Sequence, residues 1–462
     1  MNLRLRFVAL AVLIFLIFSL NLVLELDFKQ TISLVVFMGF IFGTLLYWRF
    51  RLAFALTGIV ILLVLGLIDV PTLVDFSGLD IILFLMGMMI VIGFLEERRF
   101  FEYLVDKITT LAGTSGIRLV VVMMILSAFF AALVDEVTSI LFMAASMIHL
   151  TLRVKMNPVP FIIMLVFATN IGSSATVVGN PVGVLVALRG GLTFADFLRW
   201  ATPISIGALV IAIPLSTFYY RKEIKMLDER LKLSVESKVK SYDKAHPQSK
   251  ELWLSALLFI GTITALILHN QIEVVLHLKK NTMLVGTALA AAAIALFIDR
   301  ERARQLVERR VDWWTLAFFL LLFASVGTLN YVGVDNRIAS KMIALPLEET
   351  SLLTLFTALA SLMSAFMDNV LAVATLLPIV DELGGLGINS QPFYWGALFA
   401  GTFFGNLTLI GSTANIVAIG ILERRELGHI TLKEWIKPGA LVSVPTLAVA
   451  LLLIIIQIPL MT

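Results

Sequence analysis

The sequence predicts an all-α polytopic membrane protein with about 11 transmembrane helices plus two re-entrant hairpins, arranged as two inverted-topology repeats with broken helices. Three observations support this fold class. Of the 462 residues, 60% are hydrophobic and only 15% are charged, whereas soluble domains average about 45–50% apolar and about 25% charged residues. Apolar runs that can cross a bilayer as helices recur along the chain. Similar motifs also recur in its two halves.

The composition excludes several classes of function. The net charge is only +3, and the basic residues fall in short loops between apolar runs, so we expect no nucleic-acid partner. The chain has no cysteine, which excludes disulfides, thiolate metal sites and cysteine nucleophiles. It also contains no His-Glu-x-x-His zinc motif, no Walker loop and no dinucleotide fingerprint. We therefore expect neither an enzyme nor a bound cofactor.

Fifteen apolar segments divide the chain. The first lies in MNLRLRFVALAVLIFLIFSL, which has the basic start of a signal peptide but no small-x-small cleavage site, so we expect a retained helix. The segments lie near residues 7–24, 31–47, 52–69, 80–95, 118–133, 137–150, 159–188, 201–219, 252–270, 281–298, 312–330, 351–366, 370–383, 394–422 and 438–458.

Basic clusters set the expected orientation. They lie at residues 4–6, 49–51, 96–99, 153–155, 221–250, 300–310 and 423–425. The positive-inside rule places them in the cytoplasm, with the N-terminus cytoplasmic and the C-terminus outside a plasma (inner) membrane. Because basic clusters flank 118–150 on the same side, this segment is expected to be a re-entrant hairpin with LVDEVTS at its tip.

The segment 351–383 is expected to be a second re-entrant hairpin, which enters the membrane from the outside. Its flanking crossings place both of its ends outside, and its tip reads FMDNV. Each half of either hairpin is short for a bilayer core of about 30 Å. The alternative, fifteen full crossings, would place the basic residues at 153–155 and the loop 221–250 on opposite sides of the membrane.

An internal repeat relates the two halves. A shift of 232 residues sets TVVGNPVGV (176–184) over TLIGSTANI (408–416) and Asp80 over Asp312. Nearly the same shift sets Asp135-Glu136-Val137 over Asp368-Asn369-Val370. Because the hairpins open to opposite sides, the repeats are expected to be inverted, which is typical of secondary transporters with a midplane site. Chance similarity of apolar sequence is the competing explanation.

The repeat defines the expected domain organisation. An extra helix at 1–30 precedes the first repeat at 31–220, which contains the hairpin 118–150 and a broken helix at 159–188. A cytoplasmic linker follows at 221–250. The second repeat spans 251–462, with the hairpin 351–383 and a broken helix at 394–422. Amphipathic surface helices at 98–109 and 337–345 are expected to connect a scaffold to the hairpins.

Two polar stretches interrupt the long helices of the repeats. Residues 168–191 and 401–420 are dense in Gly, Ser, Thr and Asn, and Pro181 cannot continue a helix without losing a backbone hydrogen bond. Such small residues can simply allow close helix packing. The alternative is a helix broken at the midplane, where the N-termini of half-helices hold an anion.

The intramembrane acids are the second set of candidates. Carboxylates at bilayer depth are costly and normally face a cavity or a partner; helix capping by Asp135 and Asp368 is the alternative. The adjacent Asp135 and Glu136 suit proton coupling or, when both are ionised, Na⁺ coordination. Asp80 and Asp312 are expected to cap helices at the surface. The expected substrate- and ion-binding set is Asp135, Glu136, Thr138, Asn170, Ser173, Ser174, Thr176, Gly179, Asn180, Asp368, Asn369, Asn406, Thr408, Gly411, Ser412, Thr413 and Asn415, with a possible Na⁺ site at Asp135 and Asp368.

These motifs resemble those of a known superfamily. The stretches concerned are TNIGSSATVVGNPVGV, GLTFADFLRWATPI, MDNVLAVATLLP and GNLTLIGSTANIVAIG. They are similar to motifs of the ion transporter superfamily, in its arsenite permease and sodium–proton antiporter grouping. This grouping includes citrate-transporter-like proteins and the melanosomal P protein type of permease. The resemblance covers nearly the whole chain after the first helix. It implies a homodimer in which a scaffold domain supports a mobile transport domain that carries the hairpins and broken helices.

This sequence differs from the family's pattern at three places. The family's hairpin Asp-Asn falls on Asp368-Asn369, but in the first half it falls on Asp135-Glu136. Gly179-Asn180-Pro181-Val182-Gly183 lacks the acid and the final Asn of the family's Gly-Asp-Pro-Pro-Asn-like stretch. The Ser-Asn-Thr tips of the dicarboxylate branch are absent, which makes a di- or tricarboxylate a weaker choice of substrate.

The expected function is secondary-active transport of a small anion or oxyanion, of the arsenite type, coupled to H⁺ or Na⁺. No Lys or Arg falls in the predicted core, so an anion would depend on helix dipoles, amides or a co-bound cation. Sodium–proton antiport is the close alternative. An intramembrane hydrolase, a passive channel and a respiratory-complex subunit are the remaining ones.

Overall fold

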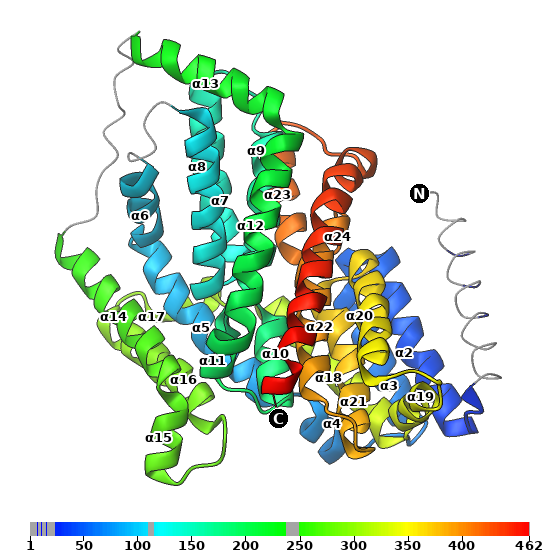
Figure 1. Cartoon of the computed structure of the whole chain (residues 1–462). Coiled ribbons are helices and arrows are strands. Elements are labelled where there is room, and N and C mark those ends of the chain that lie inside the picture. Colours follow the sequence, from blue (N-terminus) through cyan, green and yellow to red (C-terminus); the bar gives the residue numbers. More distant parts are fainter. Residues whose placement is uncertain are drawn as a thin grey trace.

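The computed structural model describes residues 7, 11, 15, 24–109, 115–236 and 249–461. Within these residues the protein is helical throughout and contains no strand, as the sequence predicts. Most of the expected first helix near 7–24 and the residues 237–248 of the expected linker lie outside the described residues. Figure 1 shows helices packed side by side, with α13 across one end of the molecule and α4, α15 and α19 at the other. We call these ends the α13 side and the α19 side.

The first half contains α2 to α12. Its elements are α2 (Phe28–Leu46), η1 (Trp48–Phe50), α3 (Arg51–Val64), α4 (Val70–Phe76), α5 (Leu79–Glu97), α6 (Phe100–Thr109), α7 (Gly116–Leu133), α8 (Glu136–Arg153), α9 (Val159–Ser173), η3 (Val177–Gly179), α10 (Pro181–Arg189), α11 (Phe194–Asp196), the π-helical turn η4 (Phe197–Ala201) and α12 (Thr202–Tyr219).

The second half follows the same order of hairpin, interrupted helix and long final helix. After α13 (Arg221–Glu236) come α14 (Ser249–Ile267), α15 (His269–Leu276), α16 (Thr282–Ile298), α17 (Ala303–Arg310), α18 (Trp313–Tyr331), α19 (Val334–Ile343), α20 (Glu349–Phe366), α21 (Asn369–Gly385), α22 (Gln391–Phe404), η5 (Gly405–Leu407), α23 (Thr413–Arg424), α24 (Leu432–Gln457) and η6 (Ile458–Leu460).

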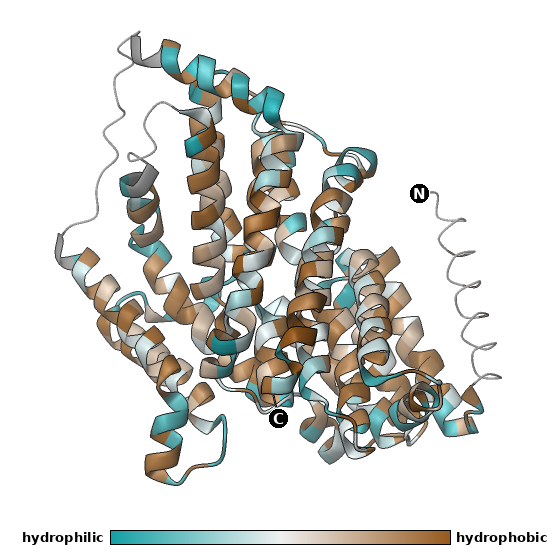
Figure 2. Cartoon of the chain, viewed as in Figure 1, coloured by the Kyte–Doolittle hydropathy of each residue, from teal (hydrophilic) through white to brown (hydrophobic). Residues whose placement is uncertain are grey.

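The body of the molecule has the surface of a membrane protein. Val210 on α12 and Phe297 on α16 are 65% and 81% exposed, and large exposed apolar side chains of this kind normally mark a contact surface. Hydrophilic residues gather on α13 and α15, while the helices between them are mostly hydrophobic (Figure 2). This pattern fits a bilayer around the central helices.

Seven helical segments are long and apolar enough to cross a membrane, and there are up to eight if the bent pair α14–α15 counts as one span. This count covers only the described residues. The 15-residue α9 and the 17-residue α16 are apolar but shorter. The expected figure of about 11 crossings therefore stays a prediction.

Both expected hairpins turn at an aspartate that begins a helix. Asp135 separates α7 from α8 and accepts hydrogen bonds from the backbone N–H groups of Val137 (2.7 Å) and Thr138 (2.9 Å). Asp368 separates α20 from α21 and accepts one from Val370 (3.1 Å). Aspartate is a preferred N-cap because its side chain satisfies N–H groups that have no partner within the helix.

The helices of each half also pack against those of the other half. Hairpin helix α8 contacts α23, and hairpin helix α21 contacts α10. Each hairpin therefore lies against the interrupted helix of the opposite half.

The segment 221–250, expected to be a solvated linker, begins with a helix. α13 covers Arg221–Glu236 and buries Ile224 and Leu227 against the rest of the chain. Asp228 accepts a hydrogen bond from the backbone N–H of Gly116 (2.9 Å), which fixes α13 to the first turn of α7. The expected helices at 98–109 and 337–345 are present as α6 and α19, and their role as connectors stays a prediction.

Candidate functional site

Four helices begin around one point in the interior. Glu136 and Asn369 are the first residues of α8 and α21, while Asn180 and Ser412 are the N-caps of α10 and α23. The side chain of Asn180 accepts a hydrogen bond from Gly183 N (2.6 Å), and that of Ser412 accepts one from Ala414 N (3.1 Å). Each helix N-terminus carries a partial positive charge. Two such ends come from each half of the chain.

The Glu136 carboxylate lies among these helix ends and is 1% exposed. One oxygen accepts hydrogen bonds from Asn369 Nδ2 (3.3 Å) and Ser412 Oγ (3.4 Å), and the other accepts one from Ser173 Oγ (3.3 Å). Three donors on α21, α23 and α9 thus meet one carboxylate. Two of the three come from the opposite half of the chain.

A set of asparagines extends this network across the two halves. Asn170 on α9 donates to Asn406 Oδ1 (2.7 Å) and Asn415 Oδ1 (2.8 Å), and its own Oδ1 accepts from Ser412 Oγ (2.9 Å). Asn415 Nδ2 donates to the backbone oxygens of Gly405 and Thr408, both at 2.8 Å. Backbone carbonyls freed by the break between α22 and α23 are satisfied in this way.

The remaining N-cap, Asn180, joins the network through Ser173. Its Nδ2 donates to Ser173 Oγ at 2.7 Å. Eight of the expected site residues therefore form one connected group: Glu136, Asn170, Ser173, Asn180, Asn369, Asn406, Ser412 and Asn415.

Matching threonines and glycines hold the breaks against the hairpins. The hydroxyl of Thr176 donates to the carbonyl of Ala132, and that of Thr408 donates to the carbonyl of Ala365. A Cβ on Gly411 would lie 2.6 Å from Gly405 O and 2.9 Å from Ser364 O. A Cβ on Gly179 would overlap Ser173 O and lie 2.9 Å from Ala131 O. These two glycines are needed because backbone passes against backbone.

The other expected residues lie beside the network or apart from it. Asp368 accepts a hydrogen bond from Thr413 Oγ1 (2.7 Å) one position away from Asn369 and Ser412. Ser174 instead shares a hydrogen bond with Ser205 of α12 (2.7 Å). Asp135 bonds to the backbone at the start of its own helix, including the N–H of Thr138.

The Glu136 carboxylate at the centre of the site forms no ion pair with Lys or Arg among the described residues. Among the described residues, only hydroxyl and amide groups contact the Glu136 carboxylate. Asp135 and Asp368 are close enough to repel it. No group of three His, Asp or Glu side chains that could hold a metal ion occurs in the described part of the chain. A charge buried in this way needs a proton or a mobile cation to neutralise it.

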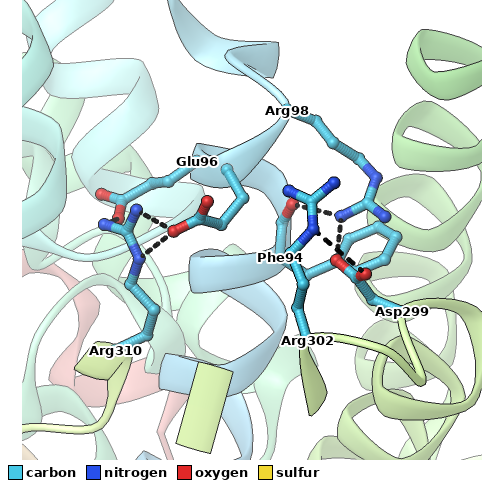
Figure 3. Close-up of polar contacts among 7 residues, drawn as sticks. Phe94, Glu96, Arg98, Asp299, Arg302 and Arg310 are labelled. Carbon is cyan, nitrogen blue, oxygen red and sulfur yellow. Dashed lines mark hydrogen bonds and ion pairs between the residues drawn. The ribbon is translucent and has the colours of Figure 1, made fainter. Parts of the chain in front are cut away.

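Sequence reasoning missed an ion-pair cluster at the end of α5. Arg310 of α17 bonds Glu96 Oε2 at 2.9 Å and also pairs with Glu97, while Arg98 bonds Asp299 Oδ2 at 3.1 Å (Figure 3). In the sequence these charges lie in two clusters about 200 residues apart, both expected in the cytoplasm, and no local pattern indicates that they pair. They fasten α5 to the segment from α16 to α17.

Comparison with known proteins identifies the family. A model of the citrate transporter family matches residues 32–400 and 311–461. The chain belongs to this family. The resemblance to the ion transporter superfamily is thus confirmed, and the protein is an integral membrane transporter, in keeping with the expectation that it is not an enzyme.

Several relatives share the family's sequence pattern. The chain is 32% identical over 381 residues to an uncharacterized transporter of Mycobacterium tuberculosis, covering 80% of this chain and 84% of that one. It is 31% identical to the 46 kDa membrane protein of Mycobacterium leprae, over 86% and 91% of the two chains. The human P protein is 25% identical over 81% of this chain, which spans only 53% of the P protein.

The fold has a counterpart among solved structures. The YdaH transporter of Alcanivorax borkumensis superposes with a TM-score of 0.58 at 18% identity, covering 85% of this chain and 90% of that one. At this level of identity the likeness concerns the fold alone.

Proposed function

We propose that this family member is a secondary-active transporter that moves a small anion by alternating access, with Glu136 as the coupling residue. The observation that carries the proposal is the convergence of four helix N-termini, two from each half, on one buried carboxylate. Positive helix ends favour an anion at this point. When it is ionised, the side chain of Glu136 supplies that anion.

A transport cycle follows from this arrangement. Protonation of Glu136 removes the resident negative charge, and the four helix ends and the Ser and Asn donors are then free to hold a substrate oxyanion or carboxylate. Deprotonation restores the internal anion and displaces the substrate. One proton is thereby coupled to each substrate ion that is bound, and the two half-sites move together because their side chains bond across the halves.

The proposal includes the membrane arrangement. The α13 side faces the cytoplasm because it carries the basic helix α13, and the α19 side faces outward. The repeats are inverted about the midplane, and the protein is a homodimer in the plasma (inner) membrane. The matching hydrogen bonds of Thr176 and Thr408 to the two hairpins support the repeat. Among anions, the family description supports citrate beside the arsenite-type species expected from the motifs.

One observation favours a second candidate, cation–proton exchange. Asp135 and Asp368 both repel Glu136. None of the three forms an ion pair with Lys or Arg among the described residues, although Arg51 lies in electrostatic range of Asp368. Na⁺ could neutralise this group, with Asp135 and Asp368 as ligands. In that case, H⁺ and Na⁺ would compete for the same carboxylates.

Proteoliposomes distinguish these functions. Full-length protein is reconstituted with a pH-sensitive dye inside, and citrate or arsenite is added under an inward proton gradient. We expect anion uptake with proton influx, which falls to the protein-free level in Glu136→Gln. Glu229→Gln, on the exposed face of α13, is the matched control and should transport normally.

A Na⁺ pulse without an anion tests the second candidate. Alkalinisation of acid-loaded vesicles by Na⁺ alone would establish exchange and overturn anion transport as the main activity. Wild-type rates in Glu136→Gln would overturn its role as the coupling residue in either function.

A further inference from the structure

A cavity of about 140 Å³ lies on the α19 side, between helices that lead to the central site. Its lining comes from α10 and α21, which begin at the site, and from α18 and α4, which lie across from them. α10 has nine residues, so at about 1.5 Å per residue it connects the site to the cavity mouth over roughly 13 Å. The cavity therefore lies beside two of the helices that begin at the central site.

The cavity is apolar inside and charged at its mouth. Leu185, Leu377 and Phe323 line it and are all buried. Arg189, Asn330 and Asp381 line it as exposed residues. The apolar part separates solvent from the central site, as a closed gate would.

Arg189 is the cation at this mouth, and its guanidinium is available. No hydrogen bond or ion pair engages it within the described residues, although Asp381 lies in electrostatic range. Asp381 itself accepts a hydrogen bond from the Tyr394 hydroxyl. A guanidinium with unused donors matches carboxylates and oxyanions.

The matching positions on the α13 side carry different residues. The repeat shift places Ile421 where α10 has Arg189, and Ile148 where α21 has Asp381. The position of Asn330 is taken by Arg98, which is bound to Asp299 (Figure 3). The α13 side has a charged opening of its own, but α9, α12, α13 and α24 line it rather than the matching helices α8 and α23.

We propose that this cavity is the outer vestibule of the central site and that Arg189 makes it selective for anions. The proposal rests on the proposed function, because it takes the α19 side as outward and the substrate as an anion. Electrostatic attraction at a cleft raises the local concentration of the ion that it favours. Arg189 thus contributes to capture of the substrate, and Glu136 to its release.

The absence of cysteine in the chain allows a test that needs no transport. Asn330→Cys places a single thiol at the mouth, and membrane-impermeant thiosulfonates of opposite charge are applied from outside to intact cells. Because Asp381 lies at the same mouth, the measured quantity is the ratio of the anionic to the cationic reaction rate with and without Arg189. We expect Arg189→Gln to lower this ratio by a factor on the order of three to ten. Gln271→Cys on the exposed face of α15, away from the cavity, is the control whose ratio should not change.

Two results would overturn the vestibule itself. One is a ratio at Asn330→Cys that Arg189→Gln leaves unchanged. The other is labelling that occurs only in inside-out vesicles. Both readouts remain valid if no transport of any anion is found, so failure of the proposed function is recognised separately.

Transport kinetics test the selectivity. Arg189→Gln should raise KM for the anion by a factor on the order of three to ten with kcat nearly unchanged, and Arg189→Lys should recover most of the loss. Arg337→Gln, which removes an exposed cation from α19, should have no effect. An unchanged KM with lower thermal stability would show that Arg189 only stabilises the end of α10 and would overturn its role in capture.

Discussion

The two hairpin tips share a set of contacts and differ in charge. In each tip an aspartate caps a helix, a threonine from the interrupted helix bonds a hairpin carbonyl, and a glycine lets the backbones touch. The first residue after the cap is Glu136 in one tip and Asn369 in the other. The second tip donates to the carboxylate that the first supplies. The shared arrangement therefore builds the site, and the difference between the tips gives it a single central carboxylate.

The largest expected effect comes from removing the close backbone approach in either tip. Gly179→Ala and Gly411→Ala would each drive a Cβ into carbonyl oxygens, so we expect a loss of stability at or above the usual overpacking cost of about 1–3 kcal/mol. Gly261→Ala, where nothing lies within 4 Å, is the control. Thermal unfolding of the purified protein in detergent measures all three. Tolerance of only one of the two alanines would show that the tips are not equivalent.

A smaller effect is expected from the asparagine that exists in one half only. Asn170→Ala removes three bonds that cross between the halves and leaves buried partners unsatisfied, at about 1–3 kcal/mol. Its counterpart by the repeat shift, Thr402, bonds only to Leu398 O in its own helix (2.8 Å). Thr402→Ala should therefore lower the free energy of unfolding by only a few tenths of the loss expected for Asn170→Ala. Denaturant unfolding compares them. Equal losses would contradict a bridge made by Asn170 alone.

The smallest expected effect concerns the paired threonines. Thr176→Val and Thr408→Val each delete one hydroxyl bond to a hairpin carbonyl, and interhelical bonds in membranes are worth about 0.6 kcal/mol on average. The two variants should shift the unfolding midpoint by similar small amounts. A markedly larger shift in one of them would mean that this hairpin depends more on its threonine than the other does.

Local sequence signals predicted much of the fold. The breaks at Pro181 and near Gly411, and the turns at Asp135 and Asp368, were predictable because proline, glycine and aspartate interrupt apolar helices for local steric and hydrogen-bonding reasons. The family followed from the motifs around these breaks. The helix at Arg221–Glu236 within the expected linker was harder to predict, because its high charge hides the apolar stripe through Ile224 and Leu227.

The site was predictable as a set of residue types but not as a network. Ser174 and Asn170 looked alike in sequence, yet one bonds to α12 and the other joins the two halves. The partners of Glu136 lie up to 276 positions away, and no local pattern fixes such pairings. The ion pairs of Arg310 were missed for the same reason.

The crossing of each hairpin onto the opposite half has a consequence for biosynthesis. Ser412 emerges from the ribosome 276 residues after Glu136, which at 5–20 residues per second corresponds to about 14–55 s. During that interval the first half is in the membrane, and the Glu136 carboxylate lacks the hydrogen-bond donors that the second half supplies later. The early chain must therefore carry Glu136 protonated or near water, and the site closes only when the second half inserts.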